Sequence, residues 1–254
     1  MKRIFITGST DGLGLAAARA LMDSGDQVLL HARTRARADT LAEDAKYALG
    51  VVVGDLGSLS ETRQLADAVN RHGRMDAVIH NAGVYLARRG TTVDGHSTTL
   101  AVNTLAPYVL SASILRPRRL IYLSSRMHRS GDVSLHDVEW TARRWSQSQA
   151  YSDSKLFVTT LTLALARRWP EVLCHAVDPG WVPTRMGGAD APDDLQRGHE
   201  TQVWLAGSED PAVLRSGGYW YHRQRQAPHA AATDSAFQDR LLSKLVELTG
   251  VALD

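Results

Sequence analysis

Short apolar runs of β type alternate with helical segments along nearly the whole chain. The apolar runs are residues 2–8, 26–33, 50–56, 75–83, 118–125, 171–180 and 216–222. Helical patterns fill most of the intervals between them, at residues 13–25, 34–49, 58–73, 97–113 and 151–169. Apolar strands that alternate with helices form a parallel sheet covered by helices on both faces. The chain is therefore predicted to be an α/β protein.

The length of the chain and its patterning limit how this architecture is divided. With 254 residues, of which 44% are hydrophobic, the chain can bury a large core. No repeat, low-complexity tract or linker interrupts it, so we expect one domain over residues 1–254. Residues 126–150 form a polar insertion, expected on the surface near the site. Residues 185–200, rich in Gly, Asp and Pro, are predicted to form a mobile lid.

Charge, cysteine content and hydropathy exclude several classes of protein. The formal net charge is +2 and the arginines are scattered, which argues against a nucleic-acid partner. The single cysteine, Cys174, lies in an apolar run and is expected to be buried. No signal peptide and no apolar stretch of about 18 residues is present, so no membrane contact is expected. The histidines lack ligand spacing, so we expect no metal. A soluble, cytoplasmic protein is predicted.

The first apolar run ends in the glycine-rich stretch "ITGSTDGLGLA", with Gly8, Gly12 and Gly14. Glycines at such a turn let the backbone approach a pyrophosphate, and the N-terminus of the following helix offers N–H groups to it. After the first strand of a parallel α/β protein, this pattern favours a dinucleotide site over a plain turn. The remaining loop residues assigned to this site are Ser9, Thr10 and Leu13.

Two other strand ends carry candidate cofactor contacts. Asp55, followed by Leu56, comes directly after the third apolar run, where a carboxylate can accept a hydrogen bond from an adenine amino group. An equal alternative for Asp55 is to cap the next helix. The fourth run ends at Asn81, Ala82 and Gly83, small residues against which an adenosine can lie, although a plain turn would use them too.

Tyr151 and Lys155 are four residues apart in a helical segment, so their side chains share one face. A neighbouring ammonium favours the phenolate form and so lowers the tyrosine pKa from about 10. Lysine also has three donors that can hold ribose hydroxyls. We interpret the pair as a proton-transfer group and its activator.

The stretches "TGSTDGLG", "NAG", "YLSS", "YSDSK" and "PGWVPT", together with Asn103, occur in the order found in one family. They resemble the short-chain dehydrogenases/reductases, and the resemblance covers essentially the whole chain. It implies a Rossmann-like, three-layer α/β/α fold with a seven-stranded parallel sheet. It also implies hydride transfer between a nicotinamide cofactor and a carbonyl or alcohol carbon.

The same resemblance implies a role for each catalytic candidate. Tyr151 is the acid/base that protonates the carbonyl oxygen, and Ser125 hydrogen-bonds that oxygen. Lys155 lowers the pKa of Tyr151 and binds the nicotinamide ribose, while Asn103 holds a relay water through its helix. The loop expected to meet the nicotinamide end of the cofactor contributes Pro179, Gly180, Val182 and Thr184.

The long interval between Ser125 and Tyr151, the nearby His128 and the C-terminal tail resemble the retinol-dehydrogenase and protochlorophyllide-reductase branch. His128 either reaches the substrate pocket or lies on the surface of the insertion. The helix after Asn103, which forms the dimer face in many relatives, is shortened and contains Pro107. We therefore expect a monomer or a dimer.

The cofactor is predicted to be NADP(H) rather than NAD(H). NAD-preferring proteins carry an acidic residue at the end of the second strand, where this chain has His31, Ala32 and Arg33. The guanidinium of Arg33 can bind a 2′-phosphate through charge-assisted hydrogen bonds, and Arg35 and Arg37 follow closely. The alternative is that these arginines form the solvated start of a helix.

The leading hypothesis is an NADP-dependent oxidoreductase that acts on a small, apolar carbonyl or alcohol substrate. One alternative is a dinucleotide-binding sensor without turnover, and another is an NADP-dependent C=C reductase. Nucleotide-sugar epimerases and dehydratases also use Tyr and Lys, but they usually have a larger C-terminal domain. The sequence identifies neither the substrate nor the direction of the reaction.

Overall fold

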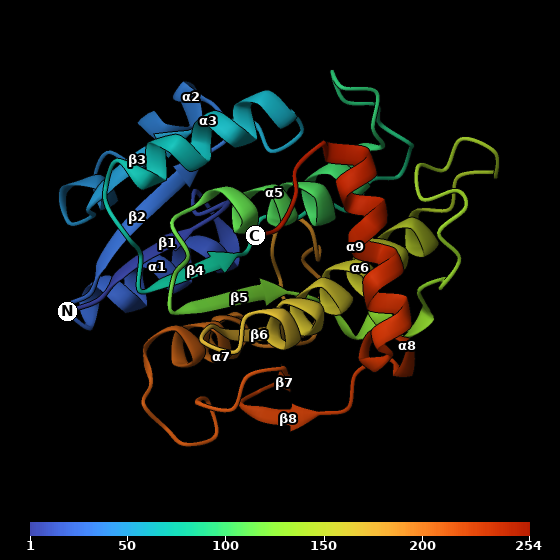
Figure 1. Ribbon diagram of the computed structural model, residues 1–254. Coiled ribbons are helices and arrows are strands. Elements are labelled where there is room, and N and C mark those ends of the chain that lie inside the picture. Colours follow the sequence, from blue (N-terminus) through green and yellow to red (C-terminus); the bar gives the residue numbers. More distant parts are fainter.

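A twisted sheet of eight strands forms the centre of the computed structural model of residues 1–254, and helices cover both of its faces (Figure 1). The strand order is β3-β2-β1-β4-β5-β6-β7-β8, and β1 to β7 run parallel. The strands are β1 (Arg3–Ile6), β2 (Gln27–Ala32), β3 (Gly50–Val53), β4 (Ala77–His80), β5 (Arg119–Leu123), β6 (Leu173–Asp178), β7 (Gly218–Tyr221) and β8 (Gln224–Gln226). The predicted three-layer, Rossmann-like fold is confirmed. Strand order reverses between β1 and β4, and this is the switch point at which such sheets bind ligands.

The predicted number of strands was one too low. The chain turns back after β7 at His222 and Arg223, both with positive φ (48° and 61°), and β8 pairs antiparallel with β7. Two consecutive residues in the left-handed region form the hairpin turn that suits the twist of the strands. No local pattern predicts β8, because its three residues are polar and exposed and its turn lacks Asn-Gly.

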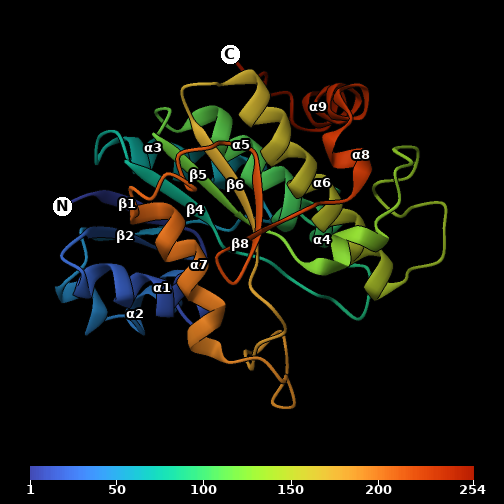
Figure 2. The same cartoon turned by 90° about the horizontal axis from the view of Figure 1, so that it is seen from below.

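The helices divide between the two faces of the sheet (Figures 1 and 2). The regular helices are α1 (Gly12–Asp23), α2 (Arg35–Asp39), α3 (Leu59–Asn70), α4 (Thr98–Leu100), α5 (Ala106–Ser113), α6 (Gln147–Arg168), α7 (Leu195–Gly207), α8 (Ala230–Thr233) and α9 (Ser235–Thr249). Alternate residues of β1 face opposite layers, with Ile4 and Ile6 packed with α1 and α7, and Phe5 packed with α3, α5 and α6. Cys174 is buried in the same core as Phe5, as expected.

Two helical segments differ from the expected continuous helices. The pattern over residues 34–49 breaks into α2 and the short 3₁₀ helix η1 (Asp44–Lys46). The segment 97–113 contains a π-helical stretch, η2 (Ala101–Leu105), between α4 and α5. Pro107 is at the start of α5 and has no N–H to donate to the preceding turn. The wide π-helical turn before Pro107 accommodates this proline within the helical segment, and it contains Asn103.

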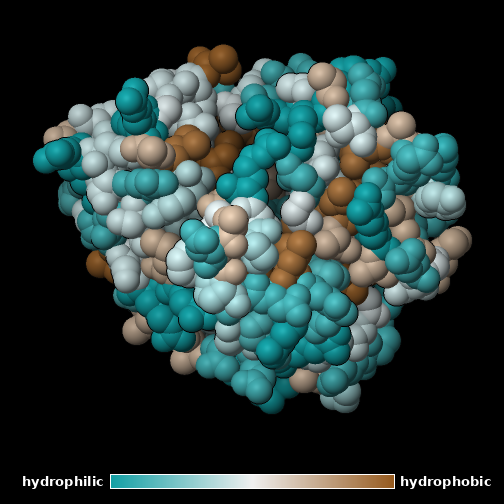
Figure 3. Space-filling model, turned by 180° about the vertical axis from the view of Figure 1, so that it is seen from behind, coloured by the Kyte–Doolittle hydropathy of each residue, from teal (hydrophilic) through white to brown (hydrophobic).

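The C-terminal helix α9 lies across α6, and α8 packs beside it (Figure 1). Phe237, Leu241 and Leu245 of α9 are buried in the same core as α6. The face of the molecule opposite to that of Figure 1 is largely hydrophilic, with its hydrophobic residues in small separate groups (Figure 3). No helix has the length and apolarity needed to cross a membrane.

Candidate active site

The loop between β1 and α1 has the backbone geometry that a dinucleotide requires. Gly8 and Gly12 have positive φ, at 64° and 52°. A Cβ on Gly14 would lie 2.3 Å from the carbonyl oxygen of Gly8 and 2.4 Å from Nδ2 of Asn81, so no side chain fits there. The N-cap residue of α1, Asp11, makes no side-chain capping bond, and the first turn has no acidic residue. The N–H groups at the start of α1 are thus free of a side-chain cap, as an incoming phosphate needs.

Asn81 and Ala82 support this loop from β4. Nδ2 of Asn81 donates to the carbonyl oxygens of Thr7 (3.0 Å) and Gly8 (3.1 Å). The N–H of Ala82 donates to Oγ1 of Thr7 at 3.1 Å. Ser9 is fully buried, and its hydroxyl donates to the carbonyl of Ile6, so only the backbone of Ser9 can face a cofactor.

The adenosine end of the predicted site lies after β3. Oδ1 of Asp55 accepts from the N–H of Gly57 at 2.8 Å, and Ser58 is the residue that caps α3. The alternative that Asp55 caps this helix is therefore wrong. The side chain of Leu56 is buried in the core, which leaves its backbone as the part available to a ligand.

A basic residue that sequence reasoning mentioned only as a neighbour contacts the glycine loop. Nη2 of Arg37 donates to Oγ1 of Thr10 at 3.0 Å and to Oδ2 of Asp11 at 2.6 Å. Arg33 is exposed at the end of β2. Thr34 caps α2 by accepting from the N–H of Arg37, and this turn brings Arg37 back toward the loop. The cap at Thr34 was the sequence signal that could have identified Arg37.

The predicted catalytic side chains come together where β4 and β5 end against α6. Nζ of Lys155 lies 5.4 Å from the ring centre of Tyr151 and donates to the carbonyl of Leu123, two residues before Ser125. The amide of Asn103 exchanges two hydrogen bonds with the backbone of Val84, at 2.8 and 3.0 Å. The side chain of Asn103 is thus occupied by protein groups.

The pKa of Tyr151 differs from the expectation. Burial raises the pKa of this phenol above its ordinary value, Asp178 and Tyr85 raise it further, and Ser125 acts in the opposite direction. In the protein alone, loss of solvation is the largest of these effects, so the net shift of the Tyr151 pKa is upward. Burial also lowers the pKa of Lys155 to about 8, so its ammonium group loses its proton more readily than that of an exposed lysine.

Two residues that sequence reasoning missed contact Tyr151. The hydroxyl of Tyr151 lies 3.9 Å from Sδ of Met186, in the predicted lid. The ring of Tyr85 packs edge-to-face on Tyr151, with centroids 5.0 Å apart. Tyr85 comes two residues after Gly83 and Met186 two residues after Thr184, so both extend stretches already assigned to the site.

The loop from Pro179 to Thr184 packs on the glycine loop. A Cβ on Gly12 would lie 3.4 Å from Cγ2 of Thr184. Val182 is buried, and a Cβ on Gly198 of α7 would lie 2.8 Å from both Val182 and Leu13. The hydroxyl of Thr184 accepts from the N–H of Gly187 within the lid segment. The structure thus brings this loop to the same edge of the sheet as the glycine loop.

The alternative that His128 lies on the surface is wrong, because its side chain is fully buried and contacts the C-terminal segment. Nδ1 of His128 donates to the carbonyl of Ser125 at 2.7 Å, and Nε2 accepts from the N–H of His229 at 2.9 Å. Burial lowers the pKa of His128 to about 4, so the ring is neutral. His128 therefore connects the Ser125 loop to the start of α8.

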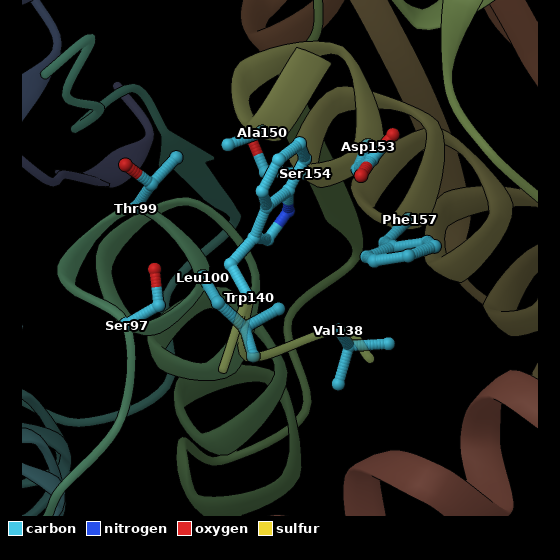
Figure 4. A pocket seen from close by; sticks show the side chains of 9 residues that line it. All are labelled: Ser97, Thr99, Leu100, Val138, Trp140, Ala150, Asp153, Ser154 and Phe157. Carbon is cyan, nitrogen blue, oxygen red and sulfur yellow. The ribbon is translucent and has the colours of Figure 1, made fainter. Parts of the chain in front are cut away.

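The insertion at residues 126–150 is packed more deeply than the expected surface excursion. It begins with the 3₁₀ helix η3 (Arg126–Ser130). Figure 4 shows Val138 and Trp140 against the start of α6, where they line a small void with Leu100, Ala150 and Phe157. Glu139 accepts from the ring of His96 and from the N–H of Ser97, each at 2.7 Å. No group of three or more His, Cys, Asp or Glu side chains is placed to hold a metal ion.

Comparisons with known proteins agree with this geometry. A family model described as short chain dehydrogenase matches residues 2–194. The chain is 40% identical over 256 residues to the short-chain dehydrogenase chry4 of Gibberella zeae, covering 100% of this chain and 99% of that protein. It is 27% identical over 282 residues to retinol dehydrogenase 13 of Homo sapiens, covering 98% and 85% of the two chains.

Among solved structures, a blue fluorescent protein from a metagenomic library, in complex with NADPH, matches with a TM-score of 0.70 and 22% identity, over 87% of this chain and 95% of that one. This match concerns the fold, whereas the family model and the relative from Gibberella zeae concern the sequence itself. Because those two matches span the glycine loop and the segment with Tyr151 and Lys155, the chain belongs to the short-chain dehydrogenase/reductase family of oxidoreductases.

Proposed function

We propose that the protein is an NADP-dependent oxidoreductase that transfers a hydride between the nicotinamide and the carbonyl or alcohol carbon of a small, apolar substrate. The observation that carries this proposal is the convergence of Tyr151, Lys155 and the Ser125 loop beside the glycine loop. The bound cofactor would supply or accept the hydride. The residues around it would position the substrate and move the proton.

The roles of the side chains follow from their chemistry. The hydroxyl of Tyr151 gives a proton to the carbonyl oxygen during reduction and takes it back during oxidation. The hydroxyl of Ser125 donates a hydrogen bond to the same oxygen. The raised pKa of Tyr151 keeps the phenol protonated at neutral pH, which is the form that reduction uses. Lys155 holds the ribose, and its charge favours the phenolate formed after proton transfer.

The preference for NADP(H) rests on the charges around the adenosine end. No acidic residue ends β2, and Arg33 is exposed there. Arg37 pairs with Asp11, the acidic residue of the glycine loop, and so removes a charge that would repel a 2′-phosphate. One charge-assisted contact contributes about 1.5–3 kcal/mol, which corresponds to a preference of roughly ten- to hundredfold in Kd.

Cofactor titrations test this preference directly. NADPH and NADH are titrated into the protein, with nicotinamide fluorescence as the signal, for the native chain, Arg33→Asp and Arg37→Ala. We expect the native chain to prefer NADPH and both variants to lose most of that preference. Equal binding of the two cofactors by the native chain would reject the assignment of NADP(H).

Turnover is tested with a panel of aldehydes, ketones, alcohols and conjugated enones, followed at the nicotinamide absorbance. Tyr151→Phe should abolish turnover and leave the Kd of NADPH within a few-fold, because only the proton donor is lost. Tyr85→Phe is the matched control, since it removes a hydroxyl from the ring packed against Tyr151. Reduction of the enones at C=C alone would favour the C=C reductase. Tight cofactor binding without turnover would favour a sensor.

A further inference from the structure

We propose that His31 is a positioning residue that fixes the glycine loop at a set distance from the end of β3. The inference rests on the cofactor site proposed above and concerns a side chain that does not itself touch the cofactor. His31 is in β2, and only 2% of its surface is exposed. Because β2 lies between β1 and β3, the imidazole can reach the ends of both neighbouring strands.

The two ring nitrogens bind two different parts of the site. The N–H of Gly8 donates to Nδ1 at 2.9 Å, and Nε2 lies 2.9 Å from the carbonyl oxygen of Gly54. An amide N–H can only donate and a carbonyl oxygen can only accept, so the ring must be neutral, with its proton on Nε2. The imidazole therefore connects the two groups in the orientation that each requires.

The backbone of His31 strengthens the same connection. Its N–H donates to Oγ of Ser9 at 2.8 Å, and the N–H of Ser9 donates to the carbonyl of His31 at 3.2 Å. Gly8 and Ser9, at the start of the glycine loop, are thus both fastened to one residue of β2. Gly8 has a positive φ, which turns its N–H in an unusual direction. This N–H therefore needs a hydrogen-bond acceptor placed to match it.

The position of His31 relates the two ends of the cofactor site. Gly8 begins the loop proposed for the pyrophosphate, and Gly54 immediately precedes Asp55, proposed for the adenine. A single rigid ring between them sets their separation. An apolar side chain could fill the same space against Phe5, but it would leave a buried N–H and a buried carbonyl without their partner.

Substitutions separate the two hydrogen bonds from simple packing. His31→Asn keeps an acceptor for the N–H of Gly8 at the position of Nδ1 but loses the donor to Gly54, whereas His31→Leu keeps only volume. We expect His31→Leu to raise the Kd of NADPH about tenfold, and His31→Asn to stay within about threefold of the native chain. His80→Leu is the matched control, because His80 is a buried histidine at the end of β4 whose ring contacts Ser111 and Tyr122 instead of the loop.

The outcomes distinguish this inference from the proposed function. If the native chain binds neither dinucleotide, the proposed function fails. If it binds NADPH and His31→Leu binds equally well, or His80→Leu loses as much affinity, the role of His31 is refuted. Where His31→Leu does not fold, nitrogen NMR of the histidine rings in the native chain decides. A neutral His31 with its proton on Nε2 supports the inference, and a proton on Nδ1 overturns it.

Discussion

Replacing Lys155 by Met is predicted to stabilise the ligand-free protein while it removes the hold on the cofactor. The side chain of Lys155 is 3% exposed, and its Nζ donates to the carbonyl of Leu123. Burial lowers its pKa from 10.5 to about 8, so the folded protein binds this proton less tightly than the unfolded chain does. The native fold therefore keeps a charged side chain at a cost in stability that methionine would avoid.

The magnitude follows from the difference between the two pKa values. At about 1.36 kcal/mol per unit, a fall from 10.5 to about 8 corresponds to about 3 kcal/mol. The full cost is present below about pH 8, and stability recovers as the pH rises from about 8 toward 10.5, where the unfolded chain also loses the proton. The variant loses the hydrogen bond to Leu123, which lowers its stability by about 1 kcal/mol. Lys155→Met should thus be about 2 kcal/mol more stable near neutral pH.

Urea unfolding measures this difference, at about pH 7 and about pH 10, for the native chain and Lys155→Met. The advantage of the variant should shrink at the higher pH, and saturating NADPH should stabilise only the native chain. Lys46→Met, a change at an exposed lysine paired with Glu43, is the control and should stay within about 0.5 kcal/mol. A variant that is less stable at neutral pH, or an advantage that does not change with pH, would refute the reasoning.

Other consequences of the structure can be measured in the same preparations. Gly14→Ala should destabilise the protein by about 2 kcal/mol or more, because its Cβ would meet backbone at 2.3 Å, whereas Gly207→Ala, with no atom within 4 Å of its Cβ, should be neutral or stabilising. Urea unfolding compares the two. The end of the predicted lid, residues 195–200, belongs to α7, so bound cofactor and substrate should protect residues 185–194 from proteolysis, and equal cleavage with and without ligands would contradict a mobile lid. Light scattering should find a monomer or dimer, since α5, the helix after Asn103, is short and carries Pro107 near its start; a stable tetramer would contradict this.

The sequence was most informative where a local pattern has a single physical explanation. Gly8, Gly12 and Gly14 were recognised because positive φ and close backbone contact both require glycine. The alternation of apolar runs with helices was sufficient for a parallel sheet, since each strand must be buried on both faces.

Features that depend on residues distant in sequence could not be predicted. His128 meets His229, which lies a hundred residues further along the chain, so its burial has no local signal. The inward orientation of Ser9 depends on its pairing with His31 of the neighbouring strand. The raised pKa of Tyr151 depends on how many groups exclude water from it, which spacing along a helix does not show.

The hairpin of β7 and β8 has a consequence for colloidal behaviour. Tyr219, Trp220 and Tyr221 form a strand of strong β propensity, and without β8 its open N–H and C=O groups would end the sheet. An open edge of this kind can pair with the same edge of another molecule. β8 occupies the edge and offers solvent three exposed polar residues, Gln224, Arg225 and Gln226. The last strand thus protects the chain from edge-to-edge aggregation.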